Sequence, residues 1–303
     1  MSRTDAPEIV ASSPEPVGLI GLGLLGGAMA ERLSAAGTRL VGFDIDAAAC
    51  GRLVGLGGMV ARHPAEVAAS CARVMLCLPD DRIAAHVVDD LHPEAGRLVI
   101  DFTTGDPRAA EASAVRLAAV GVDFIDATVL GSSEQMRRGE ATLFVAGAET
   151  ALDRARDIFG RLGAKVYDAG VAGDASRAKL VVNLVLGLNR AGLAEGLAFA
   201  ESLGLPADSV LTWLREGPAA SRIMDAKGPM MLERDYRPRA RLSQHHKDVR
   251  LMIAAAEQAG IELPLTEAHA RILARAEQLG LGDLDNAAII EAWRRCDRLE
   301  PPR

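Results

Sequence analysis

The sequence predicts an α/β protein in which a doubly wound, mostly parallel sheet is followed by an all-helical domain, the two joined by a long helix. Three observations support this prediction. The 303 residues exceed the roughly 250–300 over which a single core usually grows, so two domains are expected. Short apolar runs alternate with helical segments up to about residue 170. From Asp174 onward the strand-like runs stop and segments of helical period, rich in Ala and Leu, take over.

We therefore divide the chain into a disordered lead at 1–16, a sheet domain at 17–173 and a helical domain at 174–303. Continuous apolar runs are typical of strands that a parallel sheet buries on both faces. After a first apolar run at Val17, strands are predicted at 39–43, 74–78, 98–100, 123–125 and 141–146, with a short one within 52–61. Helices are predicted at 24–36, 64–72, 107–119, 176–203, 209–215, 247–259, 266–279 and 287–299.

A glycine-rich turn follows the first apolar run and precedes the first helix. In this GxGxxG pattern Gly21 permits the tight turn, Gly23 lets a pyrophosphate approach the backbone, and Gly26 lets the helix pack closely on the strand. The start of the helix adds free N–H groups and a positive dipole end. The turn therefore predicts a Rossmann-type dinucleotide site, whose contacts we expect from Gly21, Leu22, Gly23, Leu24, Leu25 and Gly26.

The choice of dinucleotide depends on Asp44, which closes the second strand about 20 residues after the glycines, as the fingerprint requires. A carboxylate there can bind the two ribose hydroxyls of an adenosine. No arginine follows at 45–49 to receive a 2′-phosphate. The sequence therefore favours NAD over NADP.

The composition of the chain indicates which classes of binding partner and which cellular compartment to expect. The net charge is −7, and Lys and Arg are scattered without a dense cluster, so binding to nucleic acid or to an anionic membrane is disfavoured. The lead carries acidic residues and no long apolar core, unlike a signal peptide. No CxxC pair or metal-ligand spacing occurs, and reduced thiols in a cytoplasmic protein are expected for Cys50, Cys71, Cys77 and Cys296.

The segment 180–200 is apolar and about as long as a membrane span, yet it contains polar and charged residues, Asn183, Arg190 and Glu195 among them. We expect a helix buried between the two domains instead, which forms the spine of the molecule at 176–203.

Within this helix Lys179 and Asn183 are one turn apart and project from the same face. The spacing alone leaves two interpretations open. The lysine can extend to water while the amide bonds to backbone. Alternatively, Lys179 is buried, its pKa is lowered, and it transfers a proton next to an amide that orients the substrate.

The chain carries six distinctive stretches in order: GLGLLG at 21–26, CLPD at 77–80, IDFTTGDP at 100–107, DATVLGSSEQMRRGEATLFVAG at 126–147, KLVVNLVL at 179–186 and HKDVRLM at 246–252. In these stretches and their order the chain resembles the β-hydroxyacid dehydrogenases, the family of 3-hydroxyisobutyrate dehydrogenase and tartronate semialdehyde reductase. The resemblance covers nearly the whole chain and implies a homodimer or homotetramer.

The resemblance also implies roles for single residues. Lys179 is implied as the catalytic acid/base and Asn183 as its substrate-binding partner. Hydride transfer at the carbinol carbon would accompany proton transfer to Lys179, and reduction of the aldehyde would reverse both steps. The cofactor contacts implied beyond the glycine turn and Asp44 are Leu78, Pro79, Thr103 and Lys247.

The chain departs from the family in the segment implied to receive the acid group of the substrate. The family usually has DAPVSGG there, whereas this chain has DATVLGS from Asp126 to Ser132. Leu130 takes the position of the serine, so either the hydroxyl donor has moved to Ser132 or the pocket suits a different acid. The substrate contacts expected are Thr128, Leu130, Gly131, Ser132 and, from the helical domain, Arg222.

Other charged residues have simpler expected roles. Adjacent histidines on one helix do not converge on one ion, so His245 and His246 predict no metal site. Lys227 is expected on a solvated helix face, with an anion clamp together with Arg222 as the alternative.

Three functions remain in competition. The first is an NAD-dependent dehydrogenase or reductase of a small β-hydroxy acid or its semialdehyde. An imine reductase of similar fold is the second, and Lys179 and Asp44 argue against it. A non-catalytic nucleotide-binding protein is the third.

Overall fold

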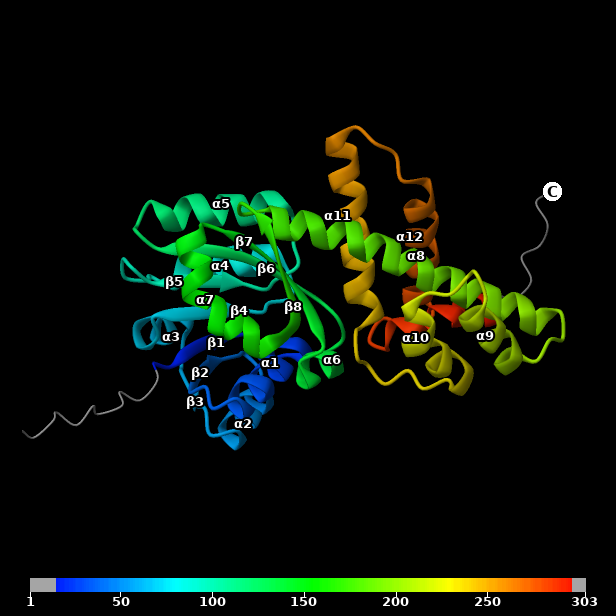
Figure 1. The fold of residues 1–303 in the computed structure, drawn as a ribbon, viewed down its shortest axis with the longest axis horizontal. Coiled ribbons are helices and arrows are strands. Elements are labelled where there is room, and N and C mark those ends of the chain that lie inside the picture. The colour runs from blue at the N-terminus through cyan, green and yellow to red at the C-terminus, as the bar shows by residue number, and fades with distance from the viewer. Residues whose placement is uncertain (1–14, 296–303) are drawn as a thin grey trace, which may run out of the picture.

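The computed structural model describes residues 15–295, and within them a single sheet organises the first domain (Figure 1). Its strand order is β3-β2-β1-β4-β5-β6-β7-β8, and neighbouring strands run parallel except at the β6–β7 pair. The predicted doubly wound sheet is therefore confirmed. The strands are β1 Val17–Ile20, β2 Leu40–Phe43, β3 Met59–Val60, β4 Arg73–Leu76, β5 Leu98–Asp101, β6 Asp123–Leu130, β7 Ala141–Gly147 and β8 Gly163–Gly170.

Helices cover both faces of the sheet. Successive strand residues point to opposite faces, so apolar residues at successive positions make both faces apolar. Leu19 belongs to the core cluster that also contains α1 and α7 residues, while its neighbour Ile20 belongs to the cluster with α3, α4 and α5 residues. Both faces are thus apolar and covered. The helices of this domain are α1 Leu24–Ala35, α2 Ala47–Gly55, α3 Pro64–Ser70, α4 Asp81–Asp90, α5 Pro107–Ala118, α6 Ser133–Arg138 and α7 Glu149–Leu162.

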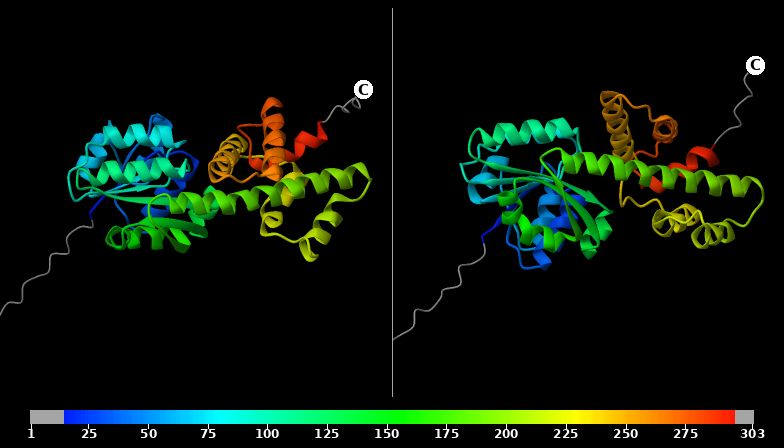
Figure 2. Two further views of the ribbon diagram at one scale, coloured as in Figure 1. Left: turned by 90° about the horizontal axis from the view of Figure 1, so that it is seen from above. Right: turned by 45° about the horizontal axis from the view of Figure 1, so that its top comes forward.

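The second domain is helical, as predicted, and is built along α8, Asp174–Ser202. Both views in Figure 2 show α8 leaving the sheet domain and running along the whole helical domain. A third core cluster lies here, to which α8 contributes Leu193 and Leu197. The other elements are α9 Ala207–Glu216, α10 Arg222–Glu233, α11 Leu242–Ala259, α12 Pro264–Gln278, the 3-10 helix η1 Asn286–Ile290 and α13 Glu291–Arg294.

Helix α8 is long and apolar enough to cross a membrane, but 44% of its most apolar window is buried inside the protein. Its buried residues include Lys179, Asn183 and Arg190. It packs against the sheet at one end and against α10, α11 and η1 at the other. The expectation of a helix buried between domains agrees with this arrangement.

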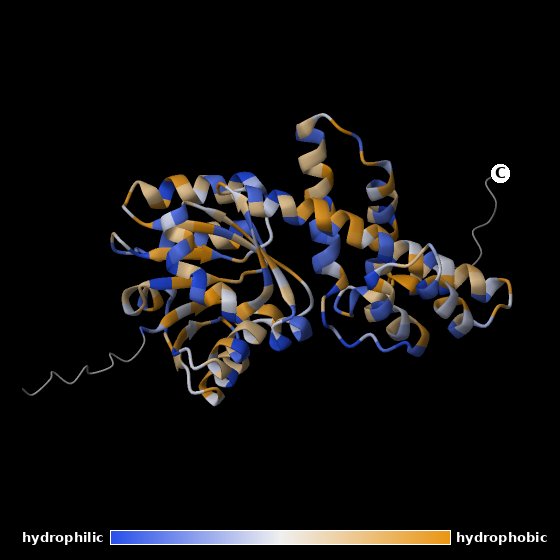
Figure 3. Cartoon of the chain, viewed as in Figure 1, coloured by the Kyte–Doolittle hydropathy of each residue, from blue (hydrophilic) through white to orange (hydrophobic). Residues whose placement is uncertain are grey.

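A second connection joins the domains through the segment between α10 and α11, which is hydrophilic along most of its length in Figure 3. Arg239 in this segment forms an ion pair with Glu134 of α6 at 2.9 Å. The Ser133 hydroxyl donates to the Arg239 carbonyl at 3.3 Å. The helix that follows the expected substrate segment is therefore fixed to the helical domain.

Several predicted boundaries were wrong, and helices that were not predicted account for most of the differences. α2, α4, α6, α7 and α10 were not predicted, and Pro229 lies inside α10. α11 begins at Leu242 and not at 247, β6 extends to Leu130, and β8 was missed. The helix predicted at 287–299 is η1 followed by α13, and its last residues, like Cys296 and most of the lead, lie outside the described range.

Candidate active site

The glycine turn between β1 and α1 is shaped by backbone contacts. Gly21 has φ +93°, and a Cβ there would lie 2.2 Å from the Cys77 carbonyl oxygen. A Cβ on Gly26 would lie 2.0 Å from the Gly21 carbonyl oxygen. At Gly23 a Cβ would meet nothing within 4 Å, and no side chain caps α1 at this residue. Open space beside uncapped helical N–H groups fits a pyrophosphate.

Asp44 lies at the end of β2 and is fixed against this turn. Its Oδ2 accepts a hydrogen bond from Leu22 N at 2.5 Å, and its Oδ1 accepts one from Asp46 N at 2.8 Å. The carboxylate is half-buried, and the neighbouring Ile45 is 96% exposed. The residues present therefore fit an adenosine ribose that donates its hydroxyls to Asp44.

The residues implied at the nicotinamide end come together from both domains. Leu78 N donates to Thr103 Oγ1 at 3.1 Å. Lys247 Nζ, on α11, donates to the carbonyl oxygens of Pro79 at 3.1 Å and Thr104 at 2.5 Å. Gln244, which sequence reasoning missed, donates to the same Pro79 oxygen at 3.2 Å. Helix α11 of the helical domain is thus hydrogen-bonded to the loops after β4 and β5.

Lys179 is 8% exposed, and its Nζ donates a hydrogen bond to the carbonyl oxygen of Val129 in β6. The interpretation that it extends to water is wrong. Burial lowers the pKa of Lys179, the nearby charge of Lys247 lowers it further, and the Asp248 carboxylate acts in the opposite direction. The amine therefore lies beside the substrate segment. At a given pH a larger fraction of it is neutral than for a lysine in water.

Asn183 is 7% exposed and donates its Nδ2 to Asp248 Oδ2 at 3.1 Å, so the expectation that it bonds to backbone was wrong. Asp248 is 6% exposed, and its Oδ1 lies 3.6 Å from Lys247 Nζ. Burial raises the pKa of Asp248. Asp248 is a residue that sequence reasoning missed. The available signal was a carboxylate one turn before Met252, on the apolar face of a helix.

The substrate segment lies partly in β6 and partly at the start of α6. Thr128 is fully buried and donates its hydroxyl to a backbone carbonyl of α8 at 3.2 Å. Leu130 ends the strand, and Gly131 turns the chain with φ +148°. Ser132 caps α6, because its Oγ accepts from Gln135 N at 3.2 Å while the Gln135 side chain accepts from Ser132 N at 2.9 Å. The Ser132 oxygen therefore accepts a hydrogen bond in the cap, and its O–H is still able to donate one.

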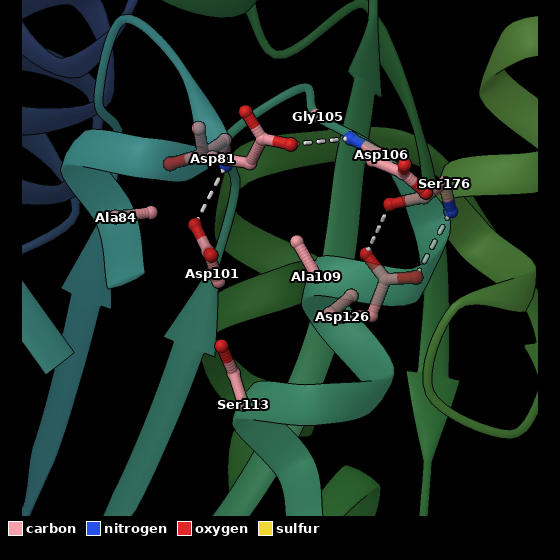
Figure 4. A pocket seen from close by; sticks show the side chains of 11 residues that line it. Asp81, Ala84, Asp101, Gly105, Asp106, Ala109, Ser113, Asp126 and Ser176 are labelled. Carbon is pink, nitrogen blue, oxygen red and sulfur yellow. Dashed lines mark hydrogen bonds between the residues drawn. The ribbon is translucent and has the colours of Figure 1, made fainter. Parts of the chain in front are cut away.

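Asp126 holds the start of α8 against β6. Its carboxylate accepts hydrogen bonds from Gly173 N at 3.0 Å, Ser176 N at 2.9 Å and Ser176 Oγ at 2.8 Å, and Figure 4 shows its contacts with Ser176. These bonds lie one turn before Lys179 and position it. Asp126 therefore has a structural role at the start of α8.

Figure 4 also shows a small cavity beside Asp126, at the carboxyl end of β5 and next to the middle of β6. Its volume is about 10 Å³, close to the space of one water molecule. Four carboxylates line it, those of Asp81, Asp101, Asp106 and Asp126. Its size and its acidic lining make it unsuited to an acid substrate.

The carboxyl group of Asp101 in this cavity is expected to make stability depend on pH. Burial raises the pKa of Asp101 to about 7 from the usual 3.8. Between these two pH values Asp101 keeps its proton in the folded protein and loses it in the unfolded chain. The free energy of unfolding therefore decreases as pH rises from about 4 to 7. Asp101→Asn should flatten the decline of the melting temperature over this window, whereas Asp90→Asn, on the exposed end of α4, should leave it intact. An unchanged slope in Asp101→Asn would contradict this assignment.

The remaining charged candidates lie elsewhere. Arg222 is exposed at the start of α10 and makes no hydrogen bond or ion pair with the other residues of 15–295. Lys227 is 6% exposed and forms a 2.5 Å ion pair with Asp285, so neither a solvated face nor an anion clamp describes it. Within the described part of the chain no three His, Cys, Asp or Glu side chains are placed to hold a metal ion.

Comparison with known families gives matches to both domains. Residues 16–172 match the family model described as the NAD binding domain of 6-phosphogluconate dehydrogenase. Residues 173–293 match the model described as NAD-binding of NADP-dependent 3-hydroxyisobutyrate dehydrogenase.

Similar proteins of known name cover almost the whole chain. Glyoxylate/succinic semialdehyde reductase 1 of Arabidopsis thaliana is 30% identical over 91% of this chain and 97% of its own length. The 2-(hydroxymethyl)glutarate dehydrogenase of Eubacterium barkeri is 27% identical over 92% and 95%. The crystal structure of a 3-hydroxyisobutyrate dehydrogenase from Salmonella typhimurium matches with a TM-score of 0.84 and 25% identity, over 92% of this chain and 99% of that one.

Proposed function

Because the chain belongs to the β-hydroxyacid dehydrogenase family, we propose that it transfers a hydride between NAD and a small hydroxy acid or its semialdehyde, with Lys179 as the general acid/base. The family makes it a nicotinamide-dependent oxidoreductase. Relatives named as a semialdehyde reductase and a hydroxy acid dehydrogenase support this substrate class. The observation that carries the proposal is the buried Lys179 amine, hydrogen-bonded at β6 and one helical turn from the Asn183–Asp248 pair.

The cofactor supplies the hydride chemistry when bound, and the protein's own residues move the proton and orient the substrate. In the oxidation, neutral Lys179 accepts the proton of the hydroxyl group; in the reduction, charged Lys179 donates it to the carbonyl oxygen. Because the pKa of Lys179 is lowered toward neutral pH, the neutral and the charged amine are more evenly populated there than for a lysine in water. Asp248 holds the Asn183 amide, which leaves the amide oxygen and the second N–H of Asn183 to orient the substrate.

A panel assay tests this proposal. Hydroxy acids with NAD, semialdehydes with NADH, and imines with either reduced cofactor are followed by the absorbance of the reduced nicotinamide. Turnover of a hydroxy acid or semialdehyde is the expected result. Turnover confined to imines would instead identify an imine reductase, and no turnover at all would leave a non-catalytic nucleotide-binding protein.

The preference for NAD rests on Asp44, whose charge would face a 2′-phosphate. We expect Asp44→Asn to reduce the discrimination against NADP, measured as the ratio of kcat/KM values, by about tenfold or more, since like charges in contact cost several kcal/mol. Asparagine retains an oxygen that accepts from Leu22 N, so the turn is preserved. Asp46→Asn is the matched control, because it removes a nearby exposed charge and still caps α2. Equal ratios in the wild type and Asp44→Asn would contradict the role of Asp44.

We also propose that the chain forms a homodimer or homotetramer. Among the exposed large apolar side chains of α8 are Val181 at 66%, Val185 at 53% and Phe199 at 62%. Their spacing places them on one face of the helix. An apolar stripe on the spine helix supports burial against a second copy.

A further inference from the structure

A cluster of buried polar groups without partners lies in the helical domain, on the same face of α8 as Lys179 and Asn183. Gly187 and Arg190 follow Asn183 by four and seven residues, which continues this face. Arg190 is 2% exposed, and its Nε and Nη2 have no hydrogen-bond partner among the described residues. Burying a guanidinium without a partner costs desolvation free energy, which lowers the stability of the fold. Its retention at this position therefore requires an explanation.

The carboxylates that attract Arg190 bond to other groups. Asp285 is fully buried and accepts hydrogen bonds from Lys227 Nζ and from three backbone N–H groups. Asp248 accepts from Asn183 through Oδ2, while its Oδ1 has no hydrogen-bond partner among the described residues and lies 3.6 Å from Lys247 Nζ. Burial lowers the pKa of Arg190 to about 10, so Arg190 is still charged at neutral pH. The protein thus holds a buried cation whose Nε and Nη2 donors have no partner among the described residues.

Two imidazole rings belong to the same cluster. His245 on α11 and His269 on α12 are 5% and 2% exposed, and their ring centroids are 5.2 Å apart. The Nε2 of each ring has no partner. A Cβ on Gly187 would lie 2.8 Å from His245 Nε2 and 3.0 Å from His269 Cε1, so both rings pack where α8 has no side chain.

These rings are neutral at neutral pH. Burial lowers the pKa of both, that of His269 to about 4, and the charge of Arg190 lowers both further. A neutral imidazole can donate one N–H to an anion. The cluster therefore offers the Arg190 fork and two further donors, which is the donor set of an anion site.

We propose that Arg190, His245 and His269 form the subsite for the carboxylate of the substrate. The Nε and Nη2 of an arginine point to the same side and bind one carboxylate through two parallel hydrogen bonds. The segment implied for this task in the family has lost one hydroxyl donor here, because Leu130 stands where the family has its serine. This inference rests on the proposed function.

The position of the subsite defines the substrate class. Lys179 and Arg190 are eleven residues apart on α8, about 16 Å along the axis at 1.5 Å per residue. This separation joins the two Cα atoms, and the long side chains of both residues shorten the span between their charged groups. The carboxylate is therefore held apart from the carbon that reacts beside Lys179, within the reach of a small substrate. The class that fits is a semialdehyde, or the corresponding hydroxy acid, with the carboxylate at the opposite end of a flexible chain.

The experiment compares semialdehydes of increasing chain length with their methyl esters, which lack the charge, in the wild type and in Arg190→Gln. The wild type should prefer the acid to the ester, and the preference in kcat/KM should increase with chain length to an optimum. In Arg190→Gln the preference should fall by about 10- to 100-fold, the value of a hydrogen bond to a charged group. Arg250→Gln makes the same charge change at an exposed position of α11 and should retain the preference.

Each outcome decides the inference. An acid-to-ester ratio in Arg190→Gln equal to that of the wild type, or a preference for the shortest acid, overturns the subsite while the proposed function stands. No turnover of any semialdehyde by the wild type refutes the proposed function instead. If Arg190→Gln does not fold, the melting temperature of the wild type is measured with NAD and either the hydroxy acid or its amide. A larger increase with the acid supports the subsite, and an equal increase overturns it.

Discussion

Lys179→Ala is expected to lower kcat by about 10²- to 10⁴-fold in both directions, the usual contribution of a positioned acid or base. The reason is positional: the amine is buried, is bonded to β6, and is held by the Asp126–Ser176 contacts at the start of α8. The affinity for NAD should change little, because the glycine turn and Asp44 lie on other elements. Turnover is measured by reduced-nicotinamide absorbance and NAD affinity by titration calorimetry.

The control for this variant is Lys165→Ala, which removes an exposed lysine from β8. It should retain wild-type turnover. Near-normal turnover in Lys179→Ala would refute the assignment of Lys179. A loss of turnover together with a loss of NAD binding would indicate a disrupted fold and not a missing acid/base.

Asp248→Asn is expected to shift the pH profile of the enzyme to lower pH. The Asp248 carboxylate raises the pKa of Lys179, so its neutralisation lowers that pKa further. Oxidation, which needs neutral Lys179, should then begin at lower pH, and reduction, which needs charged Lys179, should decline at lower pH. Asp248→Ala should in addition lower kcat by about 10- to 100-fold, because Asn183 loses its acceptor.

Asp283→Asn provides the matched control for Asp248→Asn, since Asp283 is exposed and makes no hydrogen bond with the other described residues. Its pH profile should coincide with that of the wild type. If the profile of Asp248→Asn also coincided with that of the wild type, the electrostatic coupling between Asp248 and Lys179 would be refuted.

The elements with strong local signals were predictable from the sequence. β1, β4 and β5 are apolar runs, and α8 is a long Ala- and Leu-rich segment. Helix α7 was missed although its 14 residues carry buried apolar side chains at helical spacing. Two other missed helices have weak signals: α4 is short and carries acidic residues at both ends, and α10 contains Pro229. In these helices tertiary packing of a few apolar side chains outweighs local propensity.

The same limit applies to the site. The glycine turn and the Lys179–Asn183 pair can be identified because their residues are close in sequence. Asp248 could not be assigned in this way, because its contact with Asn183 spans 65 residues and depends on how α11 packs on α8. The Arg190 cluster is not visible in the sequence for the same reason, since its members come from α8, α11 and α12.

The most direct test of Lys179 as acid/base is the pH dependence of kcat in the two directions, measured with the wild type. Because burial lowers the pKa of Lys179 below the usual 10.5, oxidation of the hydroxy acid should increase as pH rises through this pKa. Reduction of the semialdehyde should decrease through the same transition. Profiles that are flat, or that change in the same direction for both reactions, would contradict the role of Lys179.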